Sequence, residues 1–425
     1  MVSRQAARLV AGSPVIASAH FTAEADPYDP VSNPDGYVNV GTAENRLVWD
    51  LLAPRLRAAR AVGAAHIRYA PLHGTAALRS QVARFLGRSG AAVDPEDLIV
   101  VSGATAALDV IASVLCDPGE SLAVPVPYYG ALDTDLTGRS GARLLPVPPL
   151  GGAPLPDAAA VVDTVRRARA GGATVRALVL TSPHNPLGLV YRDTELRAYA
   201  SACAALDLDL VADEVYAHCA FTGPAFVSAR DAASGLLDPH RVHAVWGFAK
   251  DLGLPGLKVG VLHTRQPEAR AAARELAYFA PVSTDTQWLV TELLAADDWV
   301  EQFLTVGRER LAASYAAAAA HLTGAGVPFR PADAGFSIWT DLRGWLEEAT
   351  PDAEHRLWQR LFTSGRINLL PGAVFHSPEP GWFRLCHTTD PATVAEAVAR
   401  LRRVLPGPRV ATRIPGHPPD SRPAL

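Results

Sequence analysis

Lysine is almost absent from this chain of 425 residues. Only Lys250 and Lys258 are lysines among the 39 basic residues, and the other 37 are arginines. Arginine cannot lose its proton and attack a carbonyl carbon, whereas lysine can. Each of the two lysines is therefore a candidate for chemistry that arginine cannot perform.

The chain also has little excess charge and no long apolar run. Its net charge is −4, and no block of basic residues interrupts it, so we expect no nucleic-acid partner and no anionic membrane surface. No segment approaches the roughly 20 apolar residues that a membrane span requires. These absences favour a protein whose partners are small molecules.

Cysteine is scarce as well. The four cysteines are widely spaced and form no CxxC pair and no Cys/His cluster: Cys116, Cys203, Cys219 and Cys386. We expect neither a disulfide framework nor a metal site, and a reducing, cytoplasmic location. Pro14 interrupts the mildly apolar stretch near the N-terminus, which favours an N-terminal arm over a signal peptide.

Between residues 60 and 295, short β-branched apolar runs alternate with longer stretches of helical period. This alternation predicts an α/β fold with a mostly parallel sheet that helices cover on both faces. The expected strands are Leu98–Val101, Ser121–Val126, Ala177–Thr181, Leu208–Ala212, Val242–Trp246 and Val259–His263. The expected helices are 75–86, 104–115, 194–205 and a long helix from about Asp297 to Gly324.

The same pattern predicts a division into domains. Residues 1–59 would form an N-terminal arm and part of a small domain, and residues 60–295 the large domain. Residues 296–408 would form an interdomain helix and the rest of a smaller α+β domain. Residues 409–425 are rich in proline and poor in apolar residues, so we expect a disordered tail.

A short turn after the first expected strand has the character of a phosphate site. Strand Leu98–Val101 runs through Ser102, Gly103, Ala104 and Thr105 directly into a helix. Small residues at such a turn leave backbone N–H groups free at a helix N-terminus, where they can bind phosphate. The alternative is an ordinary tight turn in which Thr105 or Ser102 caps the helix.

Three other strand ends carry polar residues. Asn185 follows one strand, Asp213 and Tyr216 follow the next, and Lys250 follows the third. Ligands of open α/β sheets bind outside the carboxyl ends of the strands, so neighbouring strands would bring these residues to one site.

One cofactor requires this set of groups. Pyridoxal 5'-phosphate (PLP) needs a lysine for its aldehyde, an acid beside its ring nitrogen, donors to its phenolic oxygen and a phosphate cradle. Asp213 suits the ring nitrogen, since a negative charge favours the protonated ring. Asn185 and Tyr216 suit the phenolic oxygen, and residues 103–105 suit the phosphate.

The chain resembles the fold-type I, class I/II aminotransferase superfamily, and within it the 1-aminocyclopropane-1-carboxylate (ACC) synthases. The resemblance runs from about Tyr28 to Val404 and implies an aspartate-aminotransferase-like fold, with a seven-stranded sheet in an αβα sandwich. The segments that carry it are AEN (43–45), YAPLHGTAALR (69–79), LTSPHNPLG (180–188), ADEVYA (212–217), KDLGLPGLKVG (250–260) and EPGWFRLCHT (379–388).

This resemblance implies roles for the cofactor residues. Lys250 would bind the PLP aldehyde and later move the Cα proton, while Asp213 pairs with the ring nitrogen. Asn185 and Tyr216 would hold the phenolic oxygen. Tyr129, or alternatively Tyr128, would stack on the ring.

The resemblance also implies substrate and partner contacts. Arg384 would bind the substrate α-carboxylate in a bidentate pair. Glu44 would lie near the substrate's amino or sulfonium group. Tyr69 would reach the phosphate of the cofactor in the neighbouring subunit, so the resemblance implies a homodimer with shared active sites.

Three positions depart from the pattern of the family. In the family, the lysine that binds the cofactor is the last residue of a Ser-x-Ser-Lys motif, whereas this chain has Gly247, Phe248 and Ala249 before Lys250. The family's phosphate-binding arginine is replaced by Lys258, which keeps the charge and loses the planar fork. Leu72 stands where ACC synthases carry tyrosine.

The resemblance implies S-adenosylmethionine as substrate, with removal of the Cα proton and loss of methylthioadenosine from Cγ. The product would be ACC, or a vinylglycine-type intermediate captured in C–C bond formation with a second, electrophilic substrate in specialised biosynthesis. The alternatives are an aminotransferase that releases a keto acid and a noncatalytic PLP-binding regulator.

Overall fold

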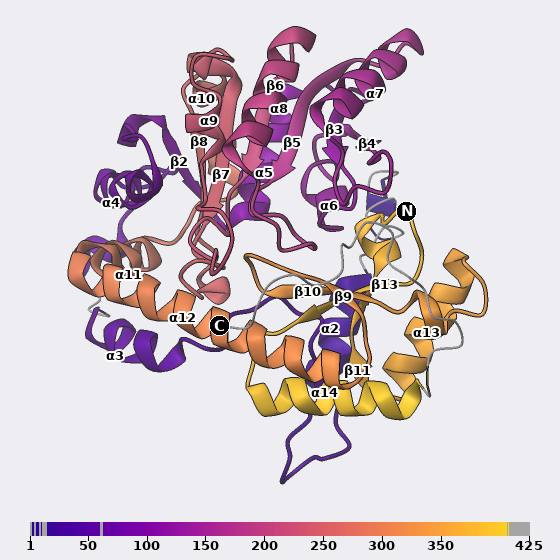
Figure 1. Ribbon diagram of the computed structural model, residues 1–425. Helices are drawn as coiled ribbons and strands as arrows, with labels where there is room; N and C mark the ends of the chain where they lie inside the picture. The colour runs from indigo at the N-terminus through magenta and orange to yellow at the C-terminus, as the bar shows by residue number, and fades with distance from the viewer. Residues whose placement is uncertain are drawn as a thin grey trace.

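The structure is a computed structural model that describes residues 2–3, 6–7, 10, 15–59, 63–405 and 407. The expected tail, 409–425, lies outside the described residues. Figure 1 shows a large sheet with its helices above and a smaller group of strands and helices below, with α12 (Asp297–Gly324) running from beneath the sheet across the smaller group.

The described residues form a seven-stranded sheet in the order β2-β8-β7-β6-β5-β3-β4, in which β8 alone runs opposite to the other six strands. The strands are β2 (Leu98–Val101), β3 (Ser121–Pro125), β4 (Arg143–Val147), β5 (Val175–Thr181), β6 (Asp209–Asp213), β7 (Val242–Gly247) and β8 (Gly260–Thr264). The expected α/β fold with a mostly parallel sheet is therefore confirmed. Strand β4 is not predicted from the sequence, because Arg143 and Pro146 break its apolar pattern, as an edge strand permits.

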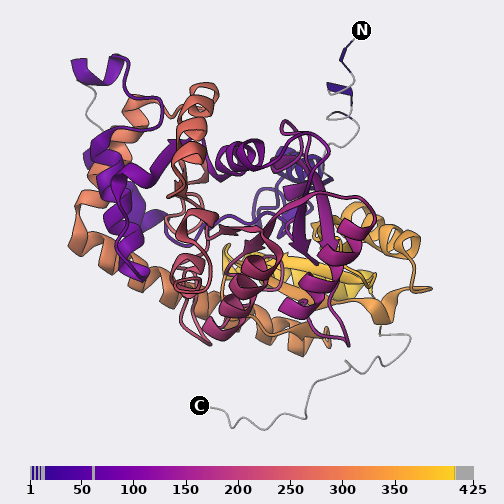
Figure 2. The same cartoon turned by 90° about the horizontal axis from the view of Figure 1, so that it is seen from above.

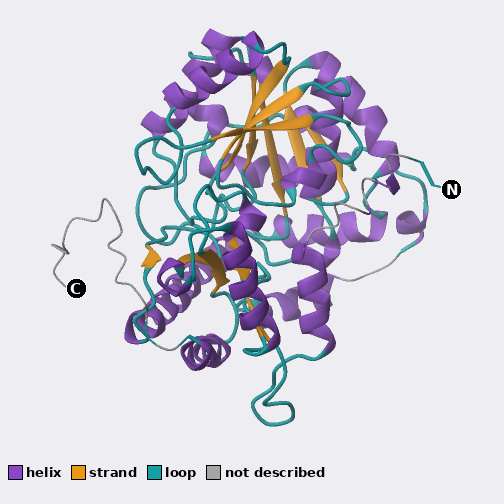
Figure 3. Ribbon diagram, turned by 90° about the vertical axis from the view of Figure 1, so that its right-hand side faces the viewer, coloured by secondary structure: helices purple, strands orange, loops and turns teal. Residues whose placement is uncertain are grey.

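Helices cover both faces of this sheet, as Figures 2 and 3 show. Alternate side chains of β5 supply the two cores: Val179 packs in the cluster that contains Ile111, whereas Leu178 and Leu180 pack in the cluster that contains Val165. The helices of this part are α3 (Trp49–Ala59), α4 (Ala76–Leu86), α5 (Ala104–Leu115), α6 (Leu132–Asp135), α7 (Ala158–Ala170), α8 (Asp193–Leu206), α9 (Ala229–Ala232), α10 (Pro267–Leu276) and α11 (Thr284–Ala295).

The smaller part combines both ends of the described chain. Strand β1 pairs in parallel with β11, so that Val38 lies opposite Ile367, and both side chains are buried in one core with Phe383. Its elements are α2 (Val15–Ala25), β1 (Val38–Asn39), β9 (Phe329–Arg330), β10 (Ser337–Asp341), α13 (Pro351–Thr363), β11 (Ile367–Asn368), β12 (Leu370–Pro371), β13 (Trp382–Cys386) and α14 (Pro391–Val404).

Helix α12 connects the two parts through one buried stripe. Phe303 packs in the core beside β2 and α4, and Leu311 packs against Tyr216 at the sheet edge. Leu322 packs in the core of the smaller part. Steps of eight and eleven residues keep these side chains on one helix face, so α12 fixes the smaller part against the carboxyl edge of the sheet.

The start of β8 passes unusually close to the turn between β2 and α5. A Cβ on Gly260 would lie 2.1 Å from the carbonyl carbon of Gly103 and 2.5 Å from the nitrogen of Ala104. Only glycine allows this approach of two backbone segments. The absence of a side chain at Gly260 thus lets β8 pack directly against the turn that the sequence predicts as a phosphate site.

We predict that Gly260→Ala lowers the free energy of unfolding by about 3 kcal/mol, because backbone atoms must move to admit the methyl group. Urea unfolding followed by circular dichroism measures the change. Gly324→Ala, where an added Cβ meets no atom within 4 Å, is the control and should stay within about 1 kcal/mol of the parent. Equal stability of both variants would contradict the close approach.

Candidate active site

The loops after β5, β6 and β7 meet at the carboxyl edge of the sheet and bring three expected residues together. Asp213 is the last residue of β6, where it lies opposite Thr181 of β5 and Val245 of β7. Asn185 follows β5 and Lys250 follows β7. The parallel pairing of these three strands therefore assembles the site.

Asp213 is a buried acid with few hydrogen-bond donors around it. Among the described residues, its side chain accepts a single hydrogen bond, from the Val215 nitrogen at 3.4 Å. Burial raises the pKa of Asp213 to about 7, and the nearby Asp135 adds to the rise. A carboxylate in this position is completed by a cationic N–H donor, as the protonated pyridine nitrogen of PLP would be.

Lys250 lies over the same edge. Its Nζ donates to the carbonyl oxygen of Ala43 at 2.6 Å and lies 6.0 Å from the centre of the Tyr216 ring. Burial lowers the pKa of Lys250, and the charge of Arg384 lowers it further. A lysine that loses its proton readily is suited to nucleophilic attack and to proton transfer.

Arg384 projects from β13 and connects the smaller part to the sheet edge. Its Nη1 donates to Asn185 Oδ1 at 3.1 Å, and its Nη2 donates to the carbonyl oxygen of Gly41 at 2.6 Å. The side chain is 2% exposed, and its Nε has no hydrogen-bond partner. Within the described chain, this buried guanidinium meets no carboxylate, so it is available for an anionic substrate group.

The turn between β2 and α5 has the open backbone expected of a phosphate cradle. Gly103 adopts a φ of +90°, and Ala104 begins α5. The Thr105 hydroxyl donates to Asp135 Oδ2 at 3.2 Å. Lys258 reaches this turn: its Cδ lies 3.9 Å from where a Cβ on Gly103 would be.

Gly247 borders the same turn. A Cβ added to Gly247 would lie 3.6 Å from the Ala104 Cβ and 3.1 Å from the carbonyl oxygen of Val259. A serine at this position would therefore direct its hydroxyl near the N-terminus of α5. In this chain the turn lacks that hydroxyl, and the Lys258 side chain lies beside it.

The two adjacent tyrosines, Tyr128 and Tyr129, have different surroundings. Tyr129 is half-buried, and the charges of Asp135, Arg384 and Asp213 all act on it. Tyr128 is already engaged, because its hydroxyl donates to Asp133 at 2.8 Å and its ring stacks on His376. Of the two tyrosines, only Tyr129 is free to face a bound ring.

Glu44 and Tyr69 lie farther out. Glu44 makes an ion pair with Arg46 at 3.6 Å, and its charge acts on Lys250. Tyr69 is fully exposed, together with Ile67 beside it. The side chain of Tyr69 thus projects into solvent and does not complete the site of its own chain.

Two buried acids near the site have contacts that the sequence does not predict. Asp251 accepts hydrogen bonds from Trp246 Nε1 at 2.8 Å, from the His218 nitrogen at 3.0 Å and from the Cys219 thiol at 3.2 Å. These contacts anchor the turn that carries Lys250 to the loop that follows Tyr216. In the sequence, the position of Asp251 directly after Lys250 is the one feature that points to this role.

Glu214 is the second such acid. It accepts hydrogen bonds from the Ser228 hydroxyl at 2.9 Å and from the Ala229 nitrogen at 2.7 Å. Burial raises the pKa of Glu214 to about 7. Glu214 therefore ties the loop after β6 to the first turn of α9, on the far side from Asp213.

The comparisons with known proteins agree with this geometry. The family model described as "Aminotransferase class I and II" matches residues 41–401. 1-Aminocyclopropane-1-carboxylate synthase 3 of Oryza sativa subsp. japonica is 37% identical over 385 residues, which cover 85% of each chain. The 1-aminocyclopropane-1-carboxylate synthase-like protein 1 of Bos taurus is 35% identical over 92% of this chain and 81% of that one.

A solved structure shares the fold. Aspartate aminotransferase from Thermus thermophilus with maleate has a TM-score of 0.79 and 25% identity, over 95% of this chain and all of that one. The chain therefore belongs to the class I and II aminotransferase family and is a PLP-dependent enzyme of fold type I. Within that family it belongs with the ACC synthases and ACC-synthase-like proteins.

Two further findings concern the described residues alone. None of their helices combines the length and apolar character needed to cross a membrane. No group of three or more His, Cys, Asp or Glu side chains among them is arranged to hold a metal ion.

The burial of Asp213 predicts a pH effect on the cofactor-free protein. Since the folded-state pKa is raised from 3.8 to about 7, the folded chain keeps a proton that the unfolded chain releases. The contribution of Asp213 to the free energy of unfolding therefore falls between pH 4 and 7. At pH 8, Asp213→Asn should be more stable than the parent by roughly 2–4 kcal/mol, and at pH 4 the two should be similar.

Urea unfolding of the cofactor-free proteins from pH 4 to 8 measures this difference. Asp163→Asn, which changes an exposed acid on α7, is the control and should follow the parent at every pH. If Asp213→Asn also follows the parent, the buried carboxyl does not titrate as its surroundings indicate.

Proposed function

We propose that this enzyme acts on S-adenosylmethionine, removes its Cα proton and releases methylthioadenosine from Cγ. The observation that carries the proposal is the buried, unpaired Arg384 beside the readily deprotonated Lys250, with Glu44 acting on that lysine. This arrangement suits a substrate with an α-carboxylate and a second positive charge. The identity of 33–37% to ACC synthases supports it.

The residues around the carboxyl edge would hold PLP. Lys250 would bind its aldehyde, Asp213 its ring nitrogen, and Asn185 and Tyr216 its phenolic oxygen. The phosphate would lie at Gly103, Ala104, Thr105 and Lys258, and Tyr129 would face the ring. When bound, PLP accepts the electron pair that a departing Cα proton leaves behind.

The protein's own groups would then direct the reaction. Arg384 would hold the α-carboxylate with a bidentate pair and so orient the Cα–H bond. The Nζ of Lys250 would remove the Cα proton as general base. Glu44 would stabilise the sulfonium or amino group by its charge.

Bond changes at Cγ determine the product. In one outcome the Cα electron pair forms a Cα–Cγ bond while the Cγ–S pair leaves with methylthioadenosine, which yields ACC. In the other, methylthioadenosine leaves with the Cγ–S pair, a base takes a Cβ proton, and a second substrate adds at Cγ. Because Cγ has lost its electron pair to sulfur, that substrate must be a nucleophile there, which corrects the electrophile expected from the sequence.

The altered cradle favours the second outcome. Gly247 and Lys258 change the contacts of the phosphate, and Leu72 changes one wall near the substrate. An enzyme that only closes the cyclopropane ring has less reason to differ at these positions.

We also propose that two chains form a homodimer with shared active sites. Tyr69 and Ile67 are fully or largely exposed, and Leu72 is partly exposed. Such aromatic and aliphatic side chains are typical of an interface. Tyr69 would reach the phosphate of the cofactor in the neighbouring chain.

The test of the substrate is incubation of the PLP-loaded enzyme with S-adenosylmethionine, followed by mass spectrometry. We expect methylthioadenosine together with ACC, or with an adduct when a nucleophile is supplied, and no release from Lys250→Ala. Keto acid formation from another amino acid without methylthioadenosine would establish an aminotransferase instead. Spectral changes without turnover of any amino acid would favour a noncatalytic regulator.

A second test separates the two lysines. We expect Lys250→Ala to lose the visible absorbance band of lysine-bound PLP and to resist labelling by borohydride. Lys258→Ala should keep the band and bind PLP about tenfold more weakly, because one charged contact to the phosphate is lost. Lys258→Arg is the matched control and should restore affinity. A band that survives in Lys250→Ala and disappears in Lys258→Ala would reverse the assignment.

A further inference from the structure

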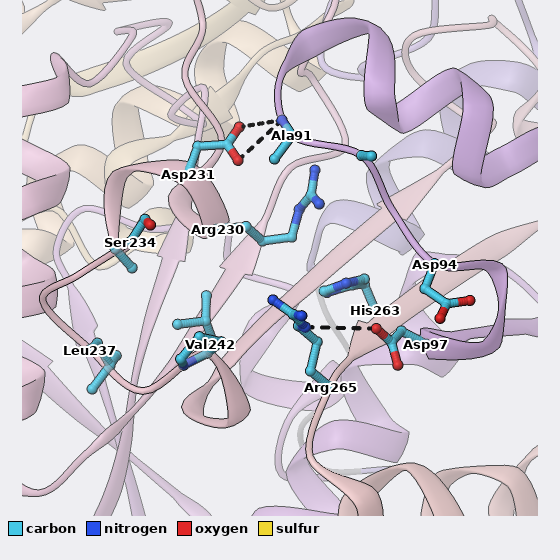
Figure 4. Close-up of a pocket in the computed structure, with 13 residues that line it drawn as sticks. Ala91, Asp94, Asp97, Arg230, Asp231, Ser234, Leu237, Val242, His263 and Arg265 are labelled. Carbon is cyan, nitrogen blue, oxygen red and sulfur yellow. Dashed lines mark hydrogen bonds and ion pairs between the residues drawn. The ribbon is translucent and has the colours of Figure 1, made fainter.

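A pocket opens at the amino edge of the large sheet, opposite the lysine site (Figure 4). It lies beside Val242, where β7 begins, and its volume is about 230 Å³. Six residues of β7 separate it from the site, a length of roughly 20 Å. Its charged and imidazole lining, which defines the amino-edge pocket, is Asp94, Asp97, Arg230, Asp231, His263 and Arg265.

The acids of the amino-edge pocket are already engaged by protein groups. Asp231 accepts two contacts from the Ala91 nitrogen, at 3.2 and 3.3 Å (Figure 4). Asp94 accepts a hydrogen bond from the Glu96 nitrogen at 2.9 Å. Asp97 makes a short ion pair with Arg270. A protein donor thus holds each carboxylate in place, and in the described part of the chain Asp97 alone of the three is paired with a cation outside the pocket lining.

The arginines are much less engaged. Within the described residues, the Arg230 side chain makes no hydrogen bond and no ion pair, while its charge acts on the buried Glu214. Arg265 makes only a long contact with Asp97, at 3.8 Å, and its side chain is 57% exposed. Two guanidinium groups therefore remain available to a ligand in the pocket.

His263 supplies a third polar group. It lines the pocket and is 4% exposed, and its Nδ1 is buried without a hydrogen-bond partner among the described residues. In Figure 4 its ring lies between the side chains of Arg230 and Arg265. Burial lowers the pKa of His263 to about 3, and the charges of the two arginines add to the effect. The neutral ring can donate one N–H.

We propose that the amino-edge pocket binds a tetrahedral oxyanion, the phosphate group of a small phosphorylated molecule. Arg230, Arg265 and His263 approach the space from different directions, and a tetrahedral group presents oxygens in several directions. A guanidinium binds such oxygens by charge-assisted hydrogen bonds. A bound anion also offsets the repulsion between the two arginines.

Isothermal titration of the PLP-loaded enzyme with inorganic phosphate tests the site, since bound PLP keeps the cofactor cradle filled. We expect one saturable site. Arg230→Gln and Arg265→Gln should each weaken phosphate binding by about tenfold or more, because each removes a charge-assisted contact. Arg166→Gln, which changes an exposed arginine on α7, is the matched control and should bind as the parent does.

Circular dichroism and thermal unfolding check that each variant is folded. Arg265→Gln keeps the test decisive if Arg230→Gln unfolds, because the Arg265 side chain is mostly exposed. Absence of saturable binding by the parent, or equal affinity in all three variants, would overturn the proposal. Tighter binding of malonate than of phosphate would overturn the choice of a tetrahedral group.

Discussion

The buried guanidinium group of Arg384 connects the segments that form the candidate active site. Arg384 comes from the smaller part, donates to Asn185 at the sheet edge, and donates to the backbone at Gly41 near the N-terminal strand. Three distant segments of the chain thus meet at one charged group that is removed from water. A buried charge is costly unless it is compensated, and here the protein provides hydrogen bonds but no carboxylate among the described residues. The compensation is left to a ligand.

The other charges at the edge follow the same physical logic. Burial raises the pKa of Asp213 and lowers that of Lys250, so each group tends toward its neutral form. Opposite shifts of this kind in neighbouring groups are typical of active sites. Asp251 and Glu214 are buried nearby, yet hydrogen bonds from the protein satisfy them. Asp251 and Glu214 therefore differ from Asp213, which accepts a single, long hydrogen bond among the described residues.

The backbone contributes constraints of equal weight. Gly260 brings β8 against the turn at Gly103, and α12 holds the smaller part against the same edge through one buried stripe. Because these contacts are made by backbone and apolar groups, side chains in the phosphate cradle can vary without loss of the fold. Gly247 and Lys258 are variations of this kind, at the turn that we propose as the phosphate cradle.

The sequence by itself determined the class of the fold, most strand positions and the polar residues at the strand ends. Apolar runs, helical periods and strand-end motifs are local signals, and each can be read within a few residues. Strand β4 is not visible in the sequence, because an edge strand need not be apolar. The role of Asp251 is not visible there either, because its partners Trp246, His218 and Cys219 become neighbours only when two loops fold together.

Tertiary structure alone decided which groups lack partners. The sequence names Arg384, Arg230 and His263 as charged or polar residues, but it does not tell whether a carboxylate lies beside them. Burial and pairing depend on segments that are far apart in the chain, because hydrogen bonds and ion pairs act over a few ångströms of space. The sequence therefore determines which residue types are present, and only the folded chain determines which of their charged and polar groups lack a partner.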